Sequence, residues 1–386
     1  MLSPRTKSWT FPHCPTPPDW RLDFAALVAQ FDWLRIMGTC PQDPQWHAEG
    51  DVLTHVGMVC RELTAMLAWR ALPETERNIV FAGALLHDAA KPRLTKEEDG
   101  HLRSRGHSLA GMRMARRILG DEIFGPGGTP FHVREQICAL VRYHGLPGTL
   151  LEKADSQRVV ITASMTARCD LVAILAEADT RGRICPGLDQ AIERVQLFRD
   201  FAGESSCLSG PYPFASAASR FRYFRTPGAP PTIDVYDATR CTVTLMCGLP
   251  ASGKDTWVKQ NAGDAPVISL DALRTEMDVD PSGDQGPVIR AAKEQAKAYL
   301  RENRGFIWNA TNTTRMLRDG LIDLFTAYNA RVRIVYCEAP MNDIRRRNAA
   351  RKVPVPMRVI EKLMDHLDVP DLAEAQEVEY SIASDK

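Results

Sequence analysis

Two patterns of hydrophobic and polar positions divide the chain. From residue 19 to about residue 201, apolar residues recur at three- and four-residue spacing, as in "NIVFAGALLHDAAK" and "DLVAILAEAD", which is typical of amphipathic helices. Beyond residue 240, the short apolar runs "CTVTLMC", "APVISL", "GFIWNA" and "RVRIVYC" predict strands, with helical stretches at 285–303 and 314–329. The patterns predict an all-α domain followed by an α/β domain with a mostly parallel sheet covered by helices.

The segment 202–240 has neither pattern. It contains "GESSCLSGPYPFASAAS" and "RTPGAPPT", which are rich in Gly, Pro and Ser and mark a boundary or linker. Between them, "RFRYFR" interleaves basic and aromatic residues; a nucleic-acid contact is one interpretation, and an aromatic-basic strand or packing segment is the one we favour. We therefore predict a helical domain over 1–201, a linker over 202–240 and an α/β domain over 241–386.

Composition narrows the class of protein. The chain has 386 residues, of which 44% are hydrophobic and 25% charged, and its formal net charge is zero. Any nucleic-acid binding must therefore use local basic patches. Ten cysteines without a C-x-x-C pair favour free thiols in a reducing compartment. No apolar run approaches the roughly 18 residues of a membrane span, so we expect a cytoplasmic protein without a membrane partner.

Histidines and aspartates stand at the ends of several predicted helices. Asp88, His144 and Asp179 each lie one helical turn after an apolar residue, which keeps them on the inward face. A single histidine of this kind is more often a satisfied core residue than a ligand. Several inward polar groups need partners, however, and convergence on one metal ion would supply them.

The spacing of these residues resembles the HD phosphohydrolase superfamily over roughly residues 45–185. "HDAAK" resembles the core H-D-x-x-K motif, and "EADTRGR" is similar to the last motif of the HD domain in bacterial tRNA nucleotidyltransferases. Mixed imidazole and carboxylate ligands suit Mn, Fe, Co or Ni at least as well as zinc, and such an ion polarises a phosphoryl oxygen and acidifies water. The resemblance implies His55, His87, Asp88 and Asp179 as ligands of one metal, His107 and His144 as holding a second metal or the substrate phosphate, and Lys91 as reaching a phosphate.

The stretch "CGLPASGKDTW" departs from a phosphate-binding loop at one position. Gly248, Gly253 and Lys254 fit the pattern G-x-x-x-x-G-K-[ST] between a predicted strand and a predicted helix, but Asp255 replaces the hydroxyl residue. Backbone amides at a helix N-terminus cradle phosphates, so we predict a site for ATP or another nucleoside triphosphate with Mg²⁺.

Asp255 needs its own explanation. A carboxylate about 4 Å from a phosphate oxygen costs about 4 kcal/mol at an effective dielectric constant of 20, but a magnesium ion between them reverses the sign. Thr256 is turned by about 100° around the helix and does not replace the missing hydroxyl. Our hypothesis is that Asp255 holds Mg²⁺, directly or through water; a tolerated acidic residue at a helix N-terminus is the alternative.

Two further motifs follow the loop. "VISLDALR" contains a D-x-x-R motif after a predicted strand, and "RRRNAARK" contains R-x-x-x-R on a predicted helix. With the loop, they resemble the kinase domain of phage-type polynucleotide kinases over about residues 241–370. The resemblance implies Asp271 as general base for a 5′-hydroxyl, Arg274 on the acceptor phosphate, Arg347 and Arg351 with Lys254 on the ATP phosphates, Ser252 and Thr256 in the nucleotide site, and Asn309, Thr311 and Asn312 at the substrate.

The two halves together resemble bacterial bifunctional end-healing enzymes of RNA repair. That resemblance implies removal of 2′,3′-cyclic phosphate and 2′- or 3′-phosphate by the HD domain, and transfer of the ATP γ-phosphate to 5′-hydroxyl ends of RNA or DNA by the kinase domain. A separate ligase would seal the healed ends. Two alternatives stay open: a small-metabolite kinase fused to a nucleotide phosphohydrolase, and a nucleotide-sensing regulator, which the six filled ligand positions disfavour.

Overall fold

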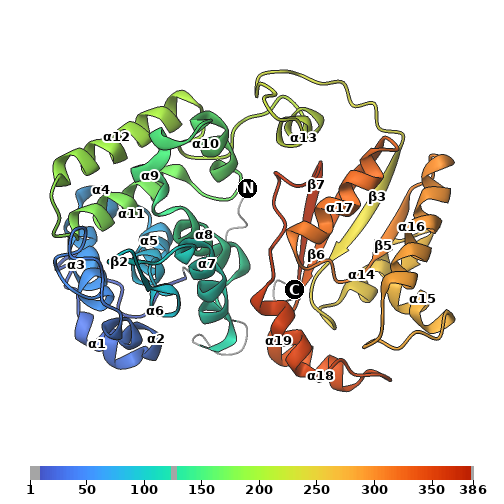
Figure 1. Cartoon of the computed structure of the whole chain (residues 1–386), viewed down its shortest axis with the longest axis horizontal. Coiled ribbons are helices and arrows are strands. Elements are labelled where there is room, and N and C mark those ends of the chain that lie inside the picture. The colour runs from blue at the N-terminus through green and yellow to red at the C-terminus, as the bar shows by residue number, and fades with distance from the viewer. Residues whose placement is uncertain (1–8, 123–127, 384–386) are drawn as a thin grey trace. The chain divides into compact units, whose positions relative to one another are not determined.

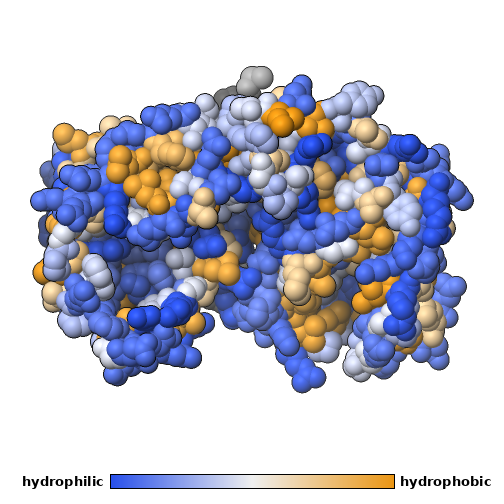
Figure 2. All heavy atoms as spheres, turned by 45° about the horizontal axis from the view of Figure 1, so that its top comes forward, coloured by the Kyte–Doolittle hydropathy of each residue, from blue (hydrophilic) through white to orange (hydrophobic). Residues whose placement is uncertain are grey.

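The computed structural model describes residues 9–122 and 128–383. It divides into two compact units, Met1–Pro213 and Phe214–Lys386, drawn in blue to green and in yellow to red in Figure 1. The division falls inside the glycine- and proline-rich segment 202–240. The face drawn in Figure 2 is mainly hydrophilic, and apolar side chains gather on it in small patches.

The N-terminal unit is built almost entirely from helices, as the three- and four-residue spacing predicts. Several helices begin at side-chain caps; Asp51, for example, accepts a hydrogen bond from the backbone nitrogen of Thr54 at the start of α3. The helices are α1 (Phe24–Gln30), α2 (Asp32–Arg35), α3 (Val52–Ala65), α4 (Leu67–Arg70), α5 (Glu74–Leu86), α6 (Lys91–Leu94), α7 (His107–Arg117), α8 (Phe131–Tyr143), α9 (Leu146–Thr149), α10 (Ser156–Ser164), α11 (Cys169–Arg181) and α12 (Leu188–Glu204), with short turns η1 (Ile36–Thr39), η2 (Ile118–Glu122) and η3 (Leu150–Glu152).

Four helices form the core of this unit. Helix α5 packs against α3, α8 and α11, and its residues 78–86 are all buried. Gly83 makes this packing close, because a Cβ atom there would lie 3.2 Å from Leu140 of α8 and 3.5 Å from Leu175 of α11. The carboxyl ends of α5, α8 and α11 carry the polar residues singled out by the sequence, so the packing of the core decides where those residues meet.

One element of this unit departs from the all-α prediction, which the rest of the unit confirms. Strands β1 (Lys96–Glu98) and β2 (His101–Arg103) form an antiparallel hairpin between α6 and α7. Asp99 and Gly100 make its two-residue turn, both with positive φ (54° and 75°). Asp-Gly is a preferred pair for such a turn. The hairpin is short and polar, and none of its strand residues is buried.

The C-terminal unit contains a five-stranded sheet in which every strand is parallel to its neighbours, in the order β4-β5-β3-β6-β7. This confirms the predicted α/β class. Figure 1 shows the helices of this unit lying along the sheet. The strands are β3 (Cys241–Cys247), β4 (Val267–Ser269), β5 (Phe306–Asn309), β6 (Ala330–Glu338) and β7 (Glu377–Ile382); the helices are α13 (Ala217–Arg225), α14 (Lys254–Asn261), α15 (Leu270–Glu276), α16 (Gly286–Arg301), α17 (Arg315–Thr326), α18 (Met341–Ala349) and α19 (Met357–Asp365).

Two elements of this unit differ from the sequence-based expectation. "RFRYFR" is part of helix α13 and not a strand, although it is a packing segment, the other form that we favoured: Tyr223 is buried, and Arg225 pairs with Asp319 and Asp323 of α17. Strand β7 was not predicted, because "EVEYSI" carries charged residues that an edge strand tolerates and a buried strand does not. Helix α13 therefore packs on the C-terminal unit instead of serving as a free linker.

All ten cysteines are free thiols, as the sequence predicts. Among the described residues, no single helix has the length and apolar character needed to cross a membrane. Helices α10 and α11 reach that threshold only when taken together, across a bend of 107°.

Candidate metal and nucleotide sites

Six histidine and aspartate side chains of the N-terminal unit converge in one place. Packing of the helix ends brings them together, and all but one are almost completely buried; the exception, His107, has 25% of its side chain exposed. The six are His55 from α3, His87 and Asp88 just beyond α5, His107 at the start of α7, His144 just beyond α8 and Asp179 near the end of α11. Every metal ligand that the sequence predicted for this domain lies in this cluster.

Asp88 stands at the centre of the cluster. Its Oδ2 atom lies 3.3 Å from Nε2 of His87 and 3.9 Å from Nε2 of His55. Its Oδ1 atom faces the other way and lies 3.5 Å from Nε2 of His107 and 4.0 Å from Nε2 of His144. The carboxylate therefore joins two groups of nitrogen ligands, and each group gathers within 4.8 Å.

The histidine rings are oriented by the backbone. In His87, His107 and His144, Nδ1 lies 2.8, 2.9 and 2.9 Å from the carbonyl oxygen three residues earlier. A carbonyl only accepts hydrogen bonds, so Nδ1 must carry the proton in each ring. In the neutral ring the lone pair is then on Nε2, which faces Asp88. Metal-binding histidines are commonly oriented in this way, by a hydrogen bond from the ring nitrogen that does not touch the metal.

Two buried atoms of the cluster make no hydrogen bond: Nε2 of His87 and Oδ1 of Asp88. A buried polar atom without a partner is unfavourable by about 1–3 kcal/mol. Nε2 of His87 belongs to one group of candidate ligands and Oδ1 of Asp88 faces the other, so a divalent cation in each group would give each atom a partner. The donor set of imidazoles and carboxylates fits such an ion.

Charges around the cluster keep its two carboxylates, Asp88 and Asp179, ionised. Burial alone would raise the pKa of Asp88, but the ammonium of Lys91, 2.7 Å from Oδ2, and neighbouring imidazoles hold it well below its usual range. The pKa of Asp179 is lowered in the same way, with Arg183 2.5 Å away. Burial lowers the pKa of His144 to about 3, so its imidazole is neutral near pH 7.

Glu49 supports the cluster and was not identified from the sequence. Its side chain is 1% exposed, and Oε1 lies 3.0 Å from Nδ1 of His55 and 2.7 Å from Nδ1 of His47. Oε2 accepts a hydrogen bond of 3.0 Å from the backbone nitrogen of Ile184, just after α11. Glu49 thus orients His55 and fastens the segment that follows Asp179. Nothing in the stretch "WHAEGDVLTH" signals this role, because it depends on contacts with residues elsewhere in the chain.

Gly182 allows α3 and α11 to meet. A Cβ atom at this position would lie 2.7 Å from the backbone nitrogen of Val59. That separation is too short for any other residue, so only glycine lets the end of α11 lie against α3. The contact sets Nε2 of His55 3.0 Å from Oδ1 of Asp179.

In the C-terminal unit, the phosphate-binding loop connects β3 to α14. Gly248 has φ 141° and Gly253 has φ 110°, conformations that favour glycine, and a Cβ atom on Gly248 would lie 2.3 Å from the carbonyl oxygen of Cys337. Lys254 is buried, and Nζ donates to the carbonyls of Gly248 (3.0 Å) and Leu249 (2.7 Å). Burial lowers the pKa of this lysine. The loop therefore has the shape that its sequence predicted.

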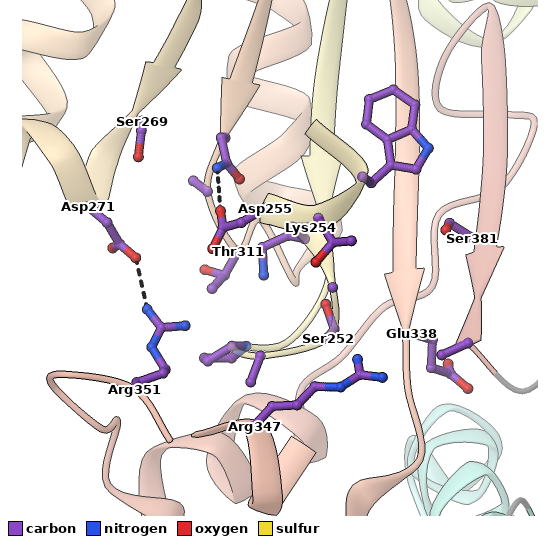
Figure 3. Close-up of a pocket in the computed structure, with 18 of the residues that line it drawn as sticks. Ser252, Lys254, Asp255, Ser269, Asp271, Thr311, Glu338, Arg347, Arg351 and Ser381 are labelled. Atoms are coloured by element: carbon purple, nitrogen blue, oxygen red, sulfur yellow. Dashed lines mark hydrogen bonds and ion pairs between the residues drawn. The ribbon is translucent and has the colours of Figure 1, made fainter. Parts of the chain in front are cut away.

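Asp255 follows Lys254 in the first turn of α14. Its Oδ1 accepts a hydrogen bond of 2.8 Å from Nδ2 of Asn309, at the end of β5, which Figure 3 shows as a dashed line. Both residues line a pocket of about 1120 Å³ above the loop. The carboxylate at the unusual position therefore faces the pocket, with an amide from the neighbouring strand beside it.

The acid and the arginines of the two later motifs reach the same pocket. Asp271 binds Arg274 at 2.6 Å and Arg351 at 3.3 Å, through different carboxylate oxygens. Arg347 pairs with Asp343 and lies close to the loop, since a Cβ atom on Gly253 would be 3.8 Å from its Nη1. Figure 3 shows Arg347 and Arg351 extending from the helical segment below the loop toward the pocket.

The remaining predicted residues divide into two groups. Ser252, Thr256 and Thr311 line the pocket, and the buried hydroxyl of Ser252 makes no hydrogen bond. Asn312 does not line it: its buried amide donates to the carbonyl of Met246 (2.8 Å) and so fixes the turn after β5. Asn312 has a φ of 42°, in the left-handed region, which asparagine adopts more readily than most residues with a side chain.

Comparison with protein-family models identifies both parts of the chain. Residues 52–180 match the HD domain, and residues 243–370 match an AAA domain. The matched ranges contain the six-ligand cluster and the phosphate-binding loop respectively, and they confirm the pairing that the motifs predicted.

Two solved structures are similar to part of the chain. One is described as a "putative kinase" from Chloroflexus aurantiacus j-10-fl; it is 20% identical, covers 38% of this chain and 87% of that chain, and has a TM-score of 0.32. The other is a sugar kinase from Janibacter sp. HTCC2649, 18% identical, covering 37% of this chain and 85% of that chain, with a TM-score of 0.29. Similarity at this level assigns no substrate.

Proposed function

We propose that this chain, an HD phosphohydrolase domain fused to a P-loop kinase-like domain, heals both ends of broken RNA. The HD domain would remove 2′,3′-cyclic phosphate and 2′- or 3′-phosphate, and the kinase domain would phosphorylate the 5′-hydroxyl of the other end. Healed ends are substrates for a separate ligase. Cleavage of RNA by transesterification leaves these two termini together, which gives one chain reason to carry both activities.

One observation supports the proposal above the others. Asp271, Arg274, Arg347 and Arg351 meet in a single pocket with the phosphate-binding loop. A base for a hydroxyl and an arginine for an acceptor phosphate are what transfer to a phosphate-bearing alcohol requires, and a polynucleotide 5′ end is such an alcohol. The same chain carries a ligand cluster suited to hydrolysis of phosphate esters.

In the HD domain, bound metal would supply electrophilic activation of the phosphoryl group and of water. His55, His87 and Asp88 would hold one ion, together with Asp179, whose Oδ1 lies 3.0 Å from Nε2 of His55 and 3.9 Å from Nε2 of His87. His107 and His144 share Asp88 on its other side. Lys91 places a positive charge beside Asp88, where it also contacts Gln42. Water adds to phosphorus and a ribose oxygen leaves, first opening the cyclic ester and then releasing inorganic phosphate.

In the kinase domain, Asp271 would accept the proton of the 5′-hydroxyl as the oxygen attacks the γ-phosphorus of ATP and ADP departs. Arg274 would bind the acceptor's phosphate. Arg347, Arg351 and Lys254 would stabilise charge on the transferred group. Asp255, oriented by Asn309, would bind Mg²⁺ directly or through water.

A direct test offers a short RNA with a 5′-hydroxyl and a 2′,3′-cyclic phosphate to the protein, with ATP, Mg²⁺ and either Mn²⁺, Co²⁺ or Ni²⁺. We expect labelled phosphate at the 5′ end and loss of phosphate from the 3′ end. Parallel reactions contain sugars and nucleosides as acceptors and free nucleotides as esters. Turnover of these small molecules with none at the RNA ends would instead establish the alternative of a metabolite kinase fused to a nucleotide phosphohydrolase.

A further inference from the structure

The ligand cluster of the HD domain opens into a pocket of about 1480 Å³. Pockets for drug-sized ligands occupy roughly 300–1,000 Å³, so this one has room for more than a terminal nucleotide. Its walls come from the loop before α3, the β1–β2 hairpin, the helix ends that carry the ligands, and the start of α12. What lies around the cluster therefore bears on which substrate the domain takes.

The walls of this pocket are strongly cationic. Seven lysine and arginine residues line it against three carboxylates, and two of those carboxylates, Asp88 and Asp179, belong to the ligand cluster. Four of the cations have carboxylate partners: Lys91 with Asp88, Arg183 with Asp179, Arg105 with Glu98 and Arg194 with Glu152. Three cations remain: Arg103, Arg142 and Lys153.

These three cations are exposed, and within residues 9–122 and 128–383 no carboxylate pairs with them. Arg103 ends the hairpin strand β2, four residues before His107. Arg142 lies in the last turn of α8, two residues before His144, and Lys153 follows η3. They come from three separate elements, so the pocket offers positive charge at several points along its walls and not at one.

Trp46 adds an aromatic surface to the same pocket. It is 55% exposed, although it is the largest apolar side chain on the loop before α3. The next residue, His47, stacks edge to face on His55 with ring centroids 4.8 Å apart. The tryptophan is thus one residue from a side chain that touches the ligand cluster.

Asp43 fixes the loop and the hairpin to one another. Its Oδ2 accepts from the backbone nitrogen of Leu102 (3.2 Å) and lies 2.9 Å from Nδ1 of His101, while Oδ1 accepts from the nitrogen of Gln45 (3.0 Å). The single carboxylate therefore holds the segments that carry Trp46 and Arg103 in one arrangement.

We propose that this pocket binds the last few nucleotides of a single-stranded polynucleotide whose 3′ end reaches the ligand cluster. Trp46 stacks on a base, and Arg103, Arg142 and Lys153 contact backbone phosphates. A cationic groove with an aromatic platform is the combination that binds single strands without reading sequence. The inference rests on the proposed function, and it adds that the domain recognises a chain and not only its terminal ester.

The test compares release of phosphate from a nucleoside 2′,3′-cyclic monophosphate with release from a ten-nucleotide RNA bearing the same end. We expect the wild-type kcat/KM to be at least tenfold higher for the RNA. Arg103→Gln with Arg142→Gln should remove most of that preference. The salt dependence of log kcat/KM should become shallower by about 0.7 for each phosphate that the variant no longer binds. In the same double variant, the decrease in kcat/KM for the cyclic monophosphate should be several-fold smaller than the decrease for the RNA.

Matched variants separate groove binding from general damage. Arg21→Gln with Arg61→Gln removes two exposed arginines of the same unit outside the pocket and should preserve the preference for RNA. Trp46→Ala should weaken RNA turnover about fivefold or more, and Trp46→Phe should restore most of it, because the ring still stacks.

The outcomes are distinguishable. If the wild-type protein removes phosphate from RNA but the groove variants retain the full preference for RNA, the inference is wrong and the proposed function stands. If the protein hydrolyses small esters and leaves RNA ends intact, the proposed function fails and the inference fails with it.

Discussion

The two candidate sites of this chain differ in how deeply their charged side chains are buried. In the HD domain, four candidate ligands, His55, His87, Asp88 and Asp179, are at most 2% exposed, and backbone carbonyls lie against Nδ1 of both histidine rings. In the kinase domain, the side chain of Asp271 is 67% exposed and carries two arginine partners. The charged groups of the first site are buried, whereas Asp271 of the second site is open to solvent.

The difference has a chemical consequence. Nε2 of His87 and Oδ1 of Asp88 make no hydrogen bond, so a cation would gain their interaction without breaking another. Phosphates entering the kinase pocket must compete with Asp271 for Arg274 and Arg351, and with loop carbonyls for Lys254. We therefore expect the HD site to be rigid toward its metal and the kinase site to rearrange when nucleotide binds.

The largest expected effect comes from Asp88→Ala, which removes the carboxylate shared by both groups of histidines. Phosphoesterase activity should be abolished, and metal content measured by mass spectrometry should fall. Asp189→Ala, on the exposed first turn of α12, is the control and should change neither quantity. Full metal content in Asp88→Ala would contradict the central place given to this residue.

Lys254→Ala should have the next largest effect, on the other site. Loss of a preorganised charge at a phosphoryl group lowers kcat by about 10²–10³. We expect that decrease in the kinase reaction, whereas Lys259→Ala, about one turn further along α14 and exposed, should keep its activity. Equal activity in both variants would show that the loop does not bind the transferred phosphate.

Glu49→Ala tests the metal site of the HD domain alone, because Glu49 is not one of the residues predicted to contact substrate. It removes one of the two acceptors beside Nδ1 of His55, the other being the carbonyl of Gly182, and loss of such a partner typically weakens metal affinity about 10–100-fold. Titration with Mn²⁺ measures the change. Glu49→Gln keeps an oxygen toward His55 and should weaken the affinity less; identical affinities in all three proteins would mean that Glu49 serves only the fold.

Asp255→Ala should have the smallest effect. If this carboxylate holds Mg²⁺, half-maximal kinase activity should require roughly tenfold more Mg²⁺, equivalent to about 1.4 kcal/mol. Asp264→Ala, an exposed acid beyond α14, is the control. Unchanged Mg²⁺ dependence in Asp255→Ala would leave Asp255 as an acidic residue favoured at a helix N-terminus.

The sequence predicted the elements of the chain better than their contacts. The helical spacing, the strands β3 to β6 and the six ligand candidates were all readable, because each depends on local periodicity or a short motif. Glu49 and Gly182 were not readable, since their meaning comes from contacts with residues far along the chain. We predicted Asn312 as a substrate contact, but its side-chain amide donates a hydrogen bond to the backbone carbonyl of Met246.

The sequence also did not indicate that the charged residues around the HD pocket lie close together. Arg103, Arg142 and Lys153 stand on separate elements, and nothing in their spacing indicates that they line one pocket with Trp46. The Asp-Gly turn of the hairpin that carries Arg103 was present in the sequence, but its strands are too short and polar to show a pattern.

We propose that two independent sites on one chain act on the two ends of the same broken RNA. The most direct measurement gives one RNA, with a 5′-hydroxyl and a 2′,3′-cyclic phosphate, to wild type, Asp88→Ala, Lys254→Ala and an equal mixture of the two variants, and analyses both ends. We predict a 5′-phosphate alone with Asp88→Ala, a free 3′ end alone with Lys254→Ala, and both changes with wild type and with the mixture. If either variant silences both reactions, or if neither RNA end changes with the wild-type protein, the account is wrong.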